Sequence, residues 1–153
     1  MAKLTPVLIV VALLVLAGFA QSDQELDRAP AGSASQILLL NITSGATEDA
    51  HAVTMALQLA GHALDDGREV VLFFNVRGAA VPTVGLPADL AFKDMPIKDL
   101  LAKLIARGAE VHVCPHCMKA LEVKADDLIA GAIVTDREKL FSKVGSNTVV
   151  FSY

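Results

Sequence analysis

The chain has 153 residues and a formal net charge of −4, with 17 acidic against 13 basic side chains. It contains no tryptophan and no cluster of basic residues, so it lacks the electrostatic footprint with which proteins bind nucleic acid. We therefore expect no nucleic-acid partner. The length fits one ordinary domain with an N-terminal extension.

The first twenty residues have the layout of a secretory signal peptide. Lys3 is the only charge among them, residues 7–16 are all apolar, and residues 17–20 supply small side chains at plausible cleavage positions. The apolar run is shorter than the ~20 residues that span a bilayer, which favours cleavage over a retained anchor. Lipidation is disfavoured because Phe19 stands where a lipoprotein signal has its cysteine. We expect a periplasmic or secreted protein with no membrane attachment after cleavage.

Residues 21–35 are polar and rich in Ala, Gly, Ser and Asp, which is typical of a flexible lead-in. The predicted organisation is thus a signal peptide over residues 1–20, a lead-in over residues 21–35 and one domain over residues 36–153.

Short apolar runs alternate with helical patterns along this domain. Strands are predicted over residues 36–42, 69–75, 110–113, 132–135 and 148–152. Helices are predicted over residues 48–66, 96–107, 115–122 and 136–144. Thr47 is the predicted N-cap of the first helix, with Glu48 and Asp49 in its first turn, and both Phe73 and Phe74 are expected in the core. The alternation predicts an α/β fold with a parallel sheet covered on both faces.

Open parallel sheets bind ligands at the carboxyl ends of their strands. Three predicted loops meet there, over residues 43–47, 75–81 and 114–117. The segment over residues 79–90 is unusually apolar for a loop, and we expect it to cover a pocket or to pack against a neighbouring subunit.

The last of these loops is Cys114-Pro115-His116-Cys117, which holds the only two cysteines in the chain. Two thiols at a strand-to-helix junction can form a disulfide, bind a soft metal or supply one activated thiolate. Backbone N–H groups at the start of a helix stabilise negative charge and lower the pKa of a thiol.

Four interpretations of this tetrad stay open. A thioredoxin-type disulfide oxidoreductase matches the four letters, but the short remainder after Cys117 contains no proline for the cis-proline of that fold. A metal site over residues 112–118 has soft ligands but no second Cys/His pair, and Met118 stands where the c-type haem motif requires histidine. A structural disulfide would close a very small loop and stabilise little. The interpretation we favour is a nucleophilic thiolate that carries a persulfide or exchanges thiols, with Cys117 as the resolving partner.

Four segments of the chain together resemble the DsrE/DsrF-like family, in order and over nearly all of residues 36–153. These segments are TSGATEDAHAVTMALQLAGHALDDG, EVVLFFNVRGAAV, GAEVHVCPHCMKALEVKADDLIAGAIV and TVVFSY. The resemblance implies a flavodoxin-like three-layer α/β/α sandwich with a mostly parallel five-stranded sheet, which commonly assembles into homo-oligomers. It also implies the passage of sulfur as a cysteine persulfide between partner proteins. The family's cysteine corresponds to Cys114, with Cys117 as a plausible resolving thiol.

The expected function is therefore sulfur or thiol handling through Cys114, with a sulfur donor or acceptor protein or a small thiol as partner. Ser44, Asn75, Arg77 and His116 are candidate substrate-binding residues around it. No cofactor and no metal are expected. Whether the protein is an enzyme, such as a sulfur transferase, or only a carrier stays open. The alternative function is a non-catalytic oligomeric module that binds a metal or small ligand through the cysteine loop.

Overall fold

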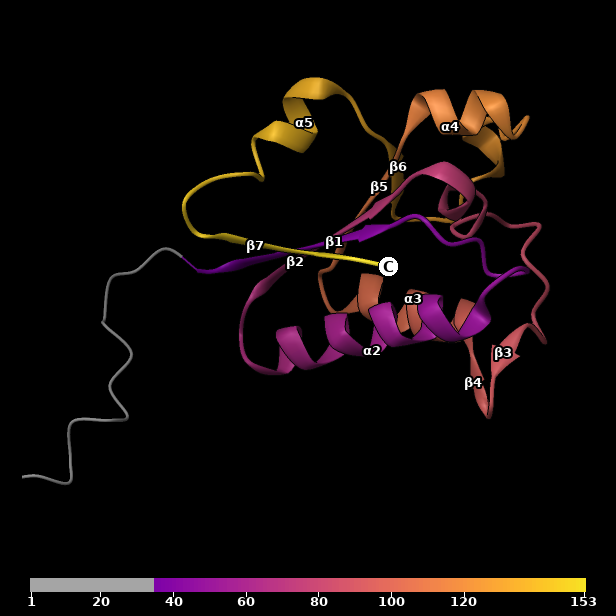
Figure 1. Ribbon diagram of the computed structural model, residues 1–153, viewed down its shortest axis with the longest axis horizontal. Coiled ribbons are helices and arrows are strands. Elements are labelled where there is room, and N and C mark those ends of the chain that lie inside the picture. Colours follow the sequence, from indigo (N-terminus) through magenta and orange to yellow (C-terminus); the bar gives the residue numbers. More distant parts are fainter. Residues whose placement is uncertain (1–34) are drawn as a thin grey trace, which may run out of the picture. The chain divides into compact units, whose positions relative to one another are not determined.

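The computed structural model describes residues 35–153 (Figure 1). The predicted signal peptide and the predicted lead-in up to residue 34 lie outside the described residues. None of the helices in the described part of the chain is long and apolar enough to cross a membrane.

The elements alternate along the chain as the sequence predicts. The strands of the large sheet are β1 (Ile37–Ile42), β2 (Glu69–Phe74), β5 (Glu110–Val113), β6 (Ala132–Val134) and β7 (Thr148–Ser152). The α-helices are α2 (Ala50–Asp65), α3 (Ile97–Ala106), α4 (Pro115–Ala120) and α5 (Arg137–Phe141). Between β2 and α3 the chain forms the 3₁₀ turn η1 (Val76–Ala80) and the hairpin of β3 (Ala91–Phe92) and β4 (Met95–Pro96), so α3 begins one residue after its predicted start. A second 3₁₀ turn, η2 (Ala125–Asp127), precedes β6.

The five strands form one parallel sheet in the order β6-β5-β2-β1-β7. Helices α2 and α3 pack against each other and cover one face of the sheet, while α5 lies over the opposite face (Figure 1). This arrangement confirms the predicted α/β class with a five-stranded parallel sheet between helical layers. The carboxyl ends of β1, β2 and β5 lie next to one another, as the site prediction requires.

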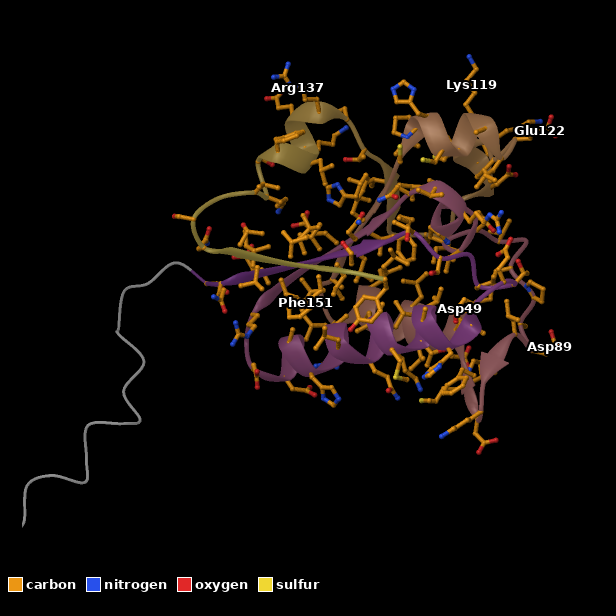
Figure 2. The ribbon with its side chains drawn as sticks, in the orientation of Figure 1. Asp49, Asp89, Lys119, Glu122, Arg137 and Phe151 are labelled. Atoms are coloured by element: carbon orange, nitrogen blue, oxygen red, sulfur yellow. The ribbon has the colours of Figure 1, made fainter. Side chains whose placement is uncertain are left out.

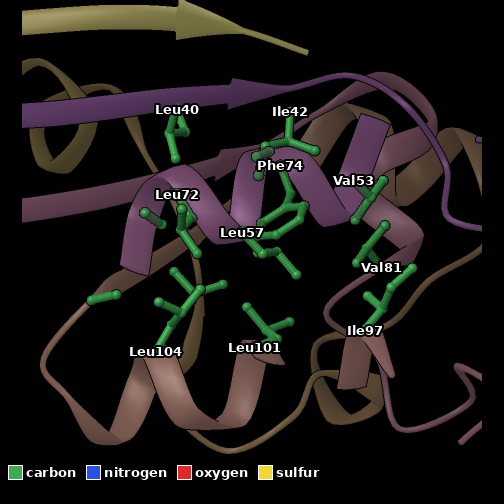
Figure 3. Packing of buried hydrophobic residues seen from close by; sticks show 14 of the residues in the cluster. Leu40, Ile42, Val53, Leu57, Leu72, Phe74, Val81, Ile97, Leu101 and Leu104 are labelled. Atoms are coloured by element: carbon green, nitrogen blue, oxygen red, sulfur yellow. The ribbon is translucent and has the colours of Figure 1, made fainter. Parts of the chain in front are cut away.

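Most of the core lies between the sheet and α2 and α3. Leu40, Leu72 and Phe74 from the central strands meet Leu57 of α2 and Leu101 of α3, all nearly inaccessible to solvent (Figure 3). Every second residue of a strand faces the same side, which explains why one face supplies these side chains.

The opposite face has a much smaller buried cluster of Ile37, Leu39 and Val71, against which Phe73 and Leu140 of α5 pack. Phe73 is only half-buried there. The prediction that Phe73 and Phe74 both belong to the core is thus correct for Phe74, whereas Phe73 packs only at the margin of the smaller cluster.

The start of the first helix differs from the prediction. Asp49 is the N-cap of α2, and its carboxylate accepts a hydrogen bond from the Ala52 N–H at 2.8 Å. The prediction of Thr47 as N-cap is wrong, since the Thr47 hydroxyl donates instead to the side chain of Glu48 at 2.9 Å. Glu48 therefore lies in the turn before the helix, where it is free to pair with a neighbouring loop.

Candidate functional site

The two cysteines lie at the carboxyl end of β5, where the topology predicts a site. The Cys114 N–H donates to the carbonyl of Phe74 at 2.9 Å, which extends the β2–β5 pairing to the first cysteine. Helix α4 then begins at Pro115, a favourable first helical residue because its missing N–H is not needed there. Cys114 is the N-cap of α4 and Cys117 lies within its first turn; both are half-buried free thiols.

Cys117 accepts a hydrogen bond from the loop that follows β2. The N–H of Val76 donates to the Cys117 sulfur at 3.0 Å. Val76 has a φ of 49°, a left-handed conformation that is a genuine outlier for a β-branched residue. Such a conformation costs about 1–2 kcal/mol, so the surrounding structure must impose it.

Gly78 anchors this loop against the end of β1. Its N–H donates to the carbonyl of Thr43 at 3.1 Å, and a Cβ at this position would lie 2.3 Å from the carbonyl oxygen of Ile42. Only glycine allows the two backbones to approach so closely. The close approach fixes η1 in place and so directs the Val76 N–H toward Cys117.

The surroundings of Cys117 raise its pKa above the ordinary value of a thiol. Burial is the main cause, and the hydrogen bond and charge interaction with Cys114 add to it. The hydrogen bond from Val76 acts in the opposite direction but is outweighed. Cys117 therefore keeps its proton at neutral pH.

The four predicted substrate-binding residues differ in their exposure and in their hydrogen-bond partners. His116 is exposed in the first turn of α4, between the two cysteines. Asn75 donates its side-chain N–H to Asn41, whose own amide donates to the Ser152 hydroxyl at 3.0 Å. Asn75 thus joins the ends of three strands instead of pointing freely into solvent.

Arg77 and Ser44 lie in the loops after β2 and β1. Arg77 is largely exposed and pairs with Glu48 at 3.9 Å. Ser44 is half-buried, and its carbonyl lies near Gly78. The charge of Arg77 is thus partly compensated by Glu48, a partner that the sequence analysis placed inside the first helix and so missed.

A hollow of about 340 Å³ lies between these loops and the end of α4. It is lined by both polar and apolar residues: Gly45, Ala46, Thr47, Glu48, Arg77, Ala80, Val81, Thr83, Gly85, Leu86, Pro87 and Leu121. The apolar segment 79–90 supplies half of this wall. Neither cysteine lines the hollow, although Arg77 directly follows Val76 and Leu121 is the C-cap of the cysteine-bearing helix.

His112 is more buried than the sequence suggests. Its Nδ1 lies 3.0 Å from the Thr135 hydroxyl and its Nε2 lies 3.2 Å from the Glu110 carboxylate, which also binds Lys143. Both ring nitrogens of His112 therefore have partners. Within residues 35–153, no group of three or more His, Cys, Asp or Glu side chains is arranged to hold a metal ion.

The model of the DsrE/DsrF-like family matches residues 37–151, which is most of this chain. The chain belongs to the DsrE/DsrF-like family. Membership in this family suggests a role of the sulfur-relay type for this DsrE-like protein.

Two solved structures share the fold of this DsrE-like protein. The YchN protein from E. coli is 15% identical and covers 78% of this chain and 100% of its own, with a TM-score of 0.63. The MTH1491 protein from Methanobacterium thermoautotrophicum, described as a protein of unknown function, is 11% identical with the same coverage and a TM-score of 0.55. No curated protein sequence matches this chain. At these identities the likeness shows the fold alone.

Proposed function

We propose that this DsrE-like protein carries sulfane sulfur as a persulfide on Cys114, with Cys117 as the resolving thiol. The observation that carries the proposal is the free thiol pair at the carboxyl end of β5, in which Cys117 has a raised pKa and accepts a hydrogen bond from the Val76 N–H. Family membership supports the same chemistry.

In the loading step, the Cys114 thiolate attacks the outer sulfur of a persulfide or polysulfide donor. A new S–S bond forms at Cys114, the donor's S–S bond breaks, and the donor leaves as a thiolate that takes up a proton. Cys117 does not compete with Cys114 for the donor in this step, because its raised pKa keeps it protonated and only a thiolate is nucleophilic.

Two routes release the sulfur. An acceptor thiolate can attack the outer sulfur, which returns Cys114 as a thiolate. Alternatively, Cys117 loses its proton and attacks the inner sulfur, so that hydrosulfide leaves and a Cys114–Cys117 disulfide remains. The raised pKa of Cys117 slows the second route at neutral pH, since only the thiolate is nucleophilic.

The surroundings of the thiols suit a sulfur donor or acceptor protein or a small thiol. Val76 and Leu121 are exposed apolar side chains on the two elements that meet at Cys117, and Val84 adds a third on the neighbouring loop. Exposed apolar side chains of this kind favour contact with a partner. Export of the chain, which rests on residues 1–20, stays a prediction.

A second candidate function is a non-catalytic module that binds a small ligand. The hollow lined by Arg77 and Glu48 favours it, because none of its walls is formed by a cysteine. Under this candidate the thiols are bystanders and ligand binding does not depend on them.

Intact-mass spectrometry of the full chain after treatment with polysulfide tests the proposal. We expect the wild type to gain one or more sulfur atoms and Cys114→Ser to gain none. The matched variant Cys117→Ser should still be loaded and should keep the added sulfur longer, because the resolving attack is removed. Equal loading of Cys114→Ser and wild type contradicts the proposal, and no loading of either favours the ligand-binding module.

A further inference from the structure

Strand β7 forms an open edge of the large sheet. In the described part of the chain it has a neighbouring strand on one side only, β1 (Figure 1). Asn147 and Tyr153 direct their backbone hydrogen bonds to β1. Because backbone groups alternate between the two sides of a strand, Val150 and Ser152 direct their N–H and C=O groups away from β1, to the open side.

This edge lacks the features that usually prevent strands from pairing with other chains. The strand reads TVVFS, without a charged residue, a proline or a glycine. Val149, Val150 and Phe151 are 38%, 53% and 46% exposed, so apolar side chains are accessible on both faces of the strand. The opposite edge, β6, is shorter, with three residues.

We propose that β7 pairs antiparallel with β7 of a second copy of this chain, about a two-fold axis at Val150. In this register Val150 lies opposite Val150 of the partner copy, and Thr148 lies opposite Ser152. All of these residues direct their backbone groups outward, which is what the hydrogen-bonded pairs of an antiparallel ladder require. The register thus pairs the whole strand and joins two sheets into one.

The side chains of the two copies also fit one another in this register. Val149 lies opposite Phe151 of the second copy, in a non-hydrogen-bonded pair whose side chains approach closely. Such aromatic and β-branched cross-strand pairs are favourable, and the absence of charge on the strand means that two copies do not repel each other there.

A hollow beneath the edge provides further apolar surface for the second copy. It measures about 310 Å³ and is lined by Val149 and Phe151 of β7, Leu38 of β1, and Leu59 and Ala63 of α2. His62, Asp66 and Arg68 also line this hollow. Both the backbone groups and the side chains of β7 fit a second β7. We therefore favour a second copy of this chain over an unrelated partner.

Sedimentation equilibrium of the full chain tests this interface. We expect a concentration-dependent dimer for the wild type, and a dissociation constant at least about tenfold higher for Val150→Glu, since like charges then meet at the axis. Val150→Lys should have the same effect. An equimolar mixture of the two variants should dimerise again, because residue 150 lies opposite itself only in the proposed register.

Ile133→Glu is the matched control, because Ile133 is 41% exposed on the other edge strand. It should leave dimerisation unchanged. Three outcomes overturn the proposal: a monomeric wild type at every concentration, as when residues of the same chain cover the edge; an assembly that Val150→Glu leaves intact; or equal disruption by Ile133→Glu.

Hydrogen exchange of the wild type tests the same register without a substitution. The amides of Val150 and Ser152 should exchange more slowly in concentrated than in dilute solution. Those of Val149 and Phe151, which face β1, should not change. Concentration-independent exchange of Val150 and Ser152 would count against the interface.

Discussion

The surroundings of Cys117 favour the protonated form of its thiol. Burial raises the pKa of Cys117, the hydrogen bond and charge of Cys114 raise it further, and the Val76 N–H offsets only part of this effect. The tetrad therefore combines Cys117, a thiol that resists ionisation, with Cys114, the proposed nucleophile.

The pH dependence of Cys117 alkylation follows from these contributions. With iodoacetamide, the midpoint of the alkylation rate of Cys117 should lie above pH 9.0, the ordinary pKa of a thiol. In Cys114→Ala the midpoint should fall toward that value while staying above it, because the Cys114 contribution is lost and burial remains. Peptide mass spectrometry measures the rate at each pH. An unchanged or higher midpoint in Cys114→Ala contradicts the assignment.

At the scale of elements, β2 shows how unevenly the two faces of the sheet are covered. Phe74 is fully buried among residues of α2 and α3 (Figure 3). Its neighbour Phe73 is half-buried and packs in the small cluster that includes Leu140 of the short helix α5. Two long helices bury far more apolar surface than one helix of five residues. The free energy of folding therefore comes mainly from the α2–α3 side.

The two phenylalanines provide a matched pair for this difference. Phe74→Ala should lower the free energy of unfolding by about 3–5 kcal/mol, the cost of a cavity in a well-packed core. Phe73→Ala should lower it by about 1–2 kcal/mol, because a half-buried ring loses less surface contact. Urea unfolding followed by circular dichroism measures both. Equal losses of unfolding free energy in the two variants would show that both faces of the sheet contribute alike to stability.

At the scale of the whole molecule, a polar network joins β5, the end of β6 and the segment after α5. His112 bridges Thr135 and Glu110, and Glu110 also binds Lys143. Burial raises the pKa of Glu110, but the hydrogen bonds from Lys143 and His112 outweigh it and lower the pKa below its ordinary value. The charged carboxylate thus stabilises the folded state.

This shift predicts a loss of stability in acid. A group with a lowered folded-state pKa contributes fully above its unfolded value, here 4.5, and the contribution is lost as the pH falls through the folded-state value. Glu110→Gln should therefore unfold with a weaker pH dependence below about pH 5 than the wild type. The difference should be less than about 1 kcal/mol, because the carboxylate is 45% exposed and screened by solvent.

Urea unfolding at several pH values between 3 and 7 measures this dependence. Glu122→Gln is the control, since Glu122 is an exposed carboxylate at the outer end of α4 (Figure 2). The prediction fails when Glu110→Gln and Glu122→Gln both keep the acid dependence of the wild type.

The sequence by itself determined the order of elements, the α/β class and the position of the cysteine loop at a strand end. These features follow from local patterns, namely apolar runs, helical periodicity and turn residues, because each pattern lies within a few neighbouring positions. The N-cap of the first helix shows the limit of this reasoning, since Thr47 and Asp49 are both acceptable caps and only the structure shows which carboxylate or hydroxyl meets a free N–H.

The tertiary structure alone decided the strand order, the burial of His112 and the contact between Val76 and Cys117. Val76 and Cys117 lie far apart in the chain, and no local pattern predicts that a valine adopts a left-handed conformation to donate its N–H to a thiol. The same holds for β7, which is an edge strand of the sheet within residues 35–153. Periodicity reports which side chains can be buried, whereas the neighbours of a strand depend on how the whole sheet assembles.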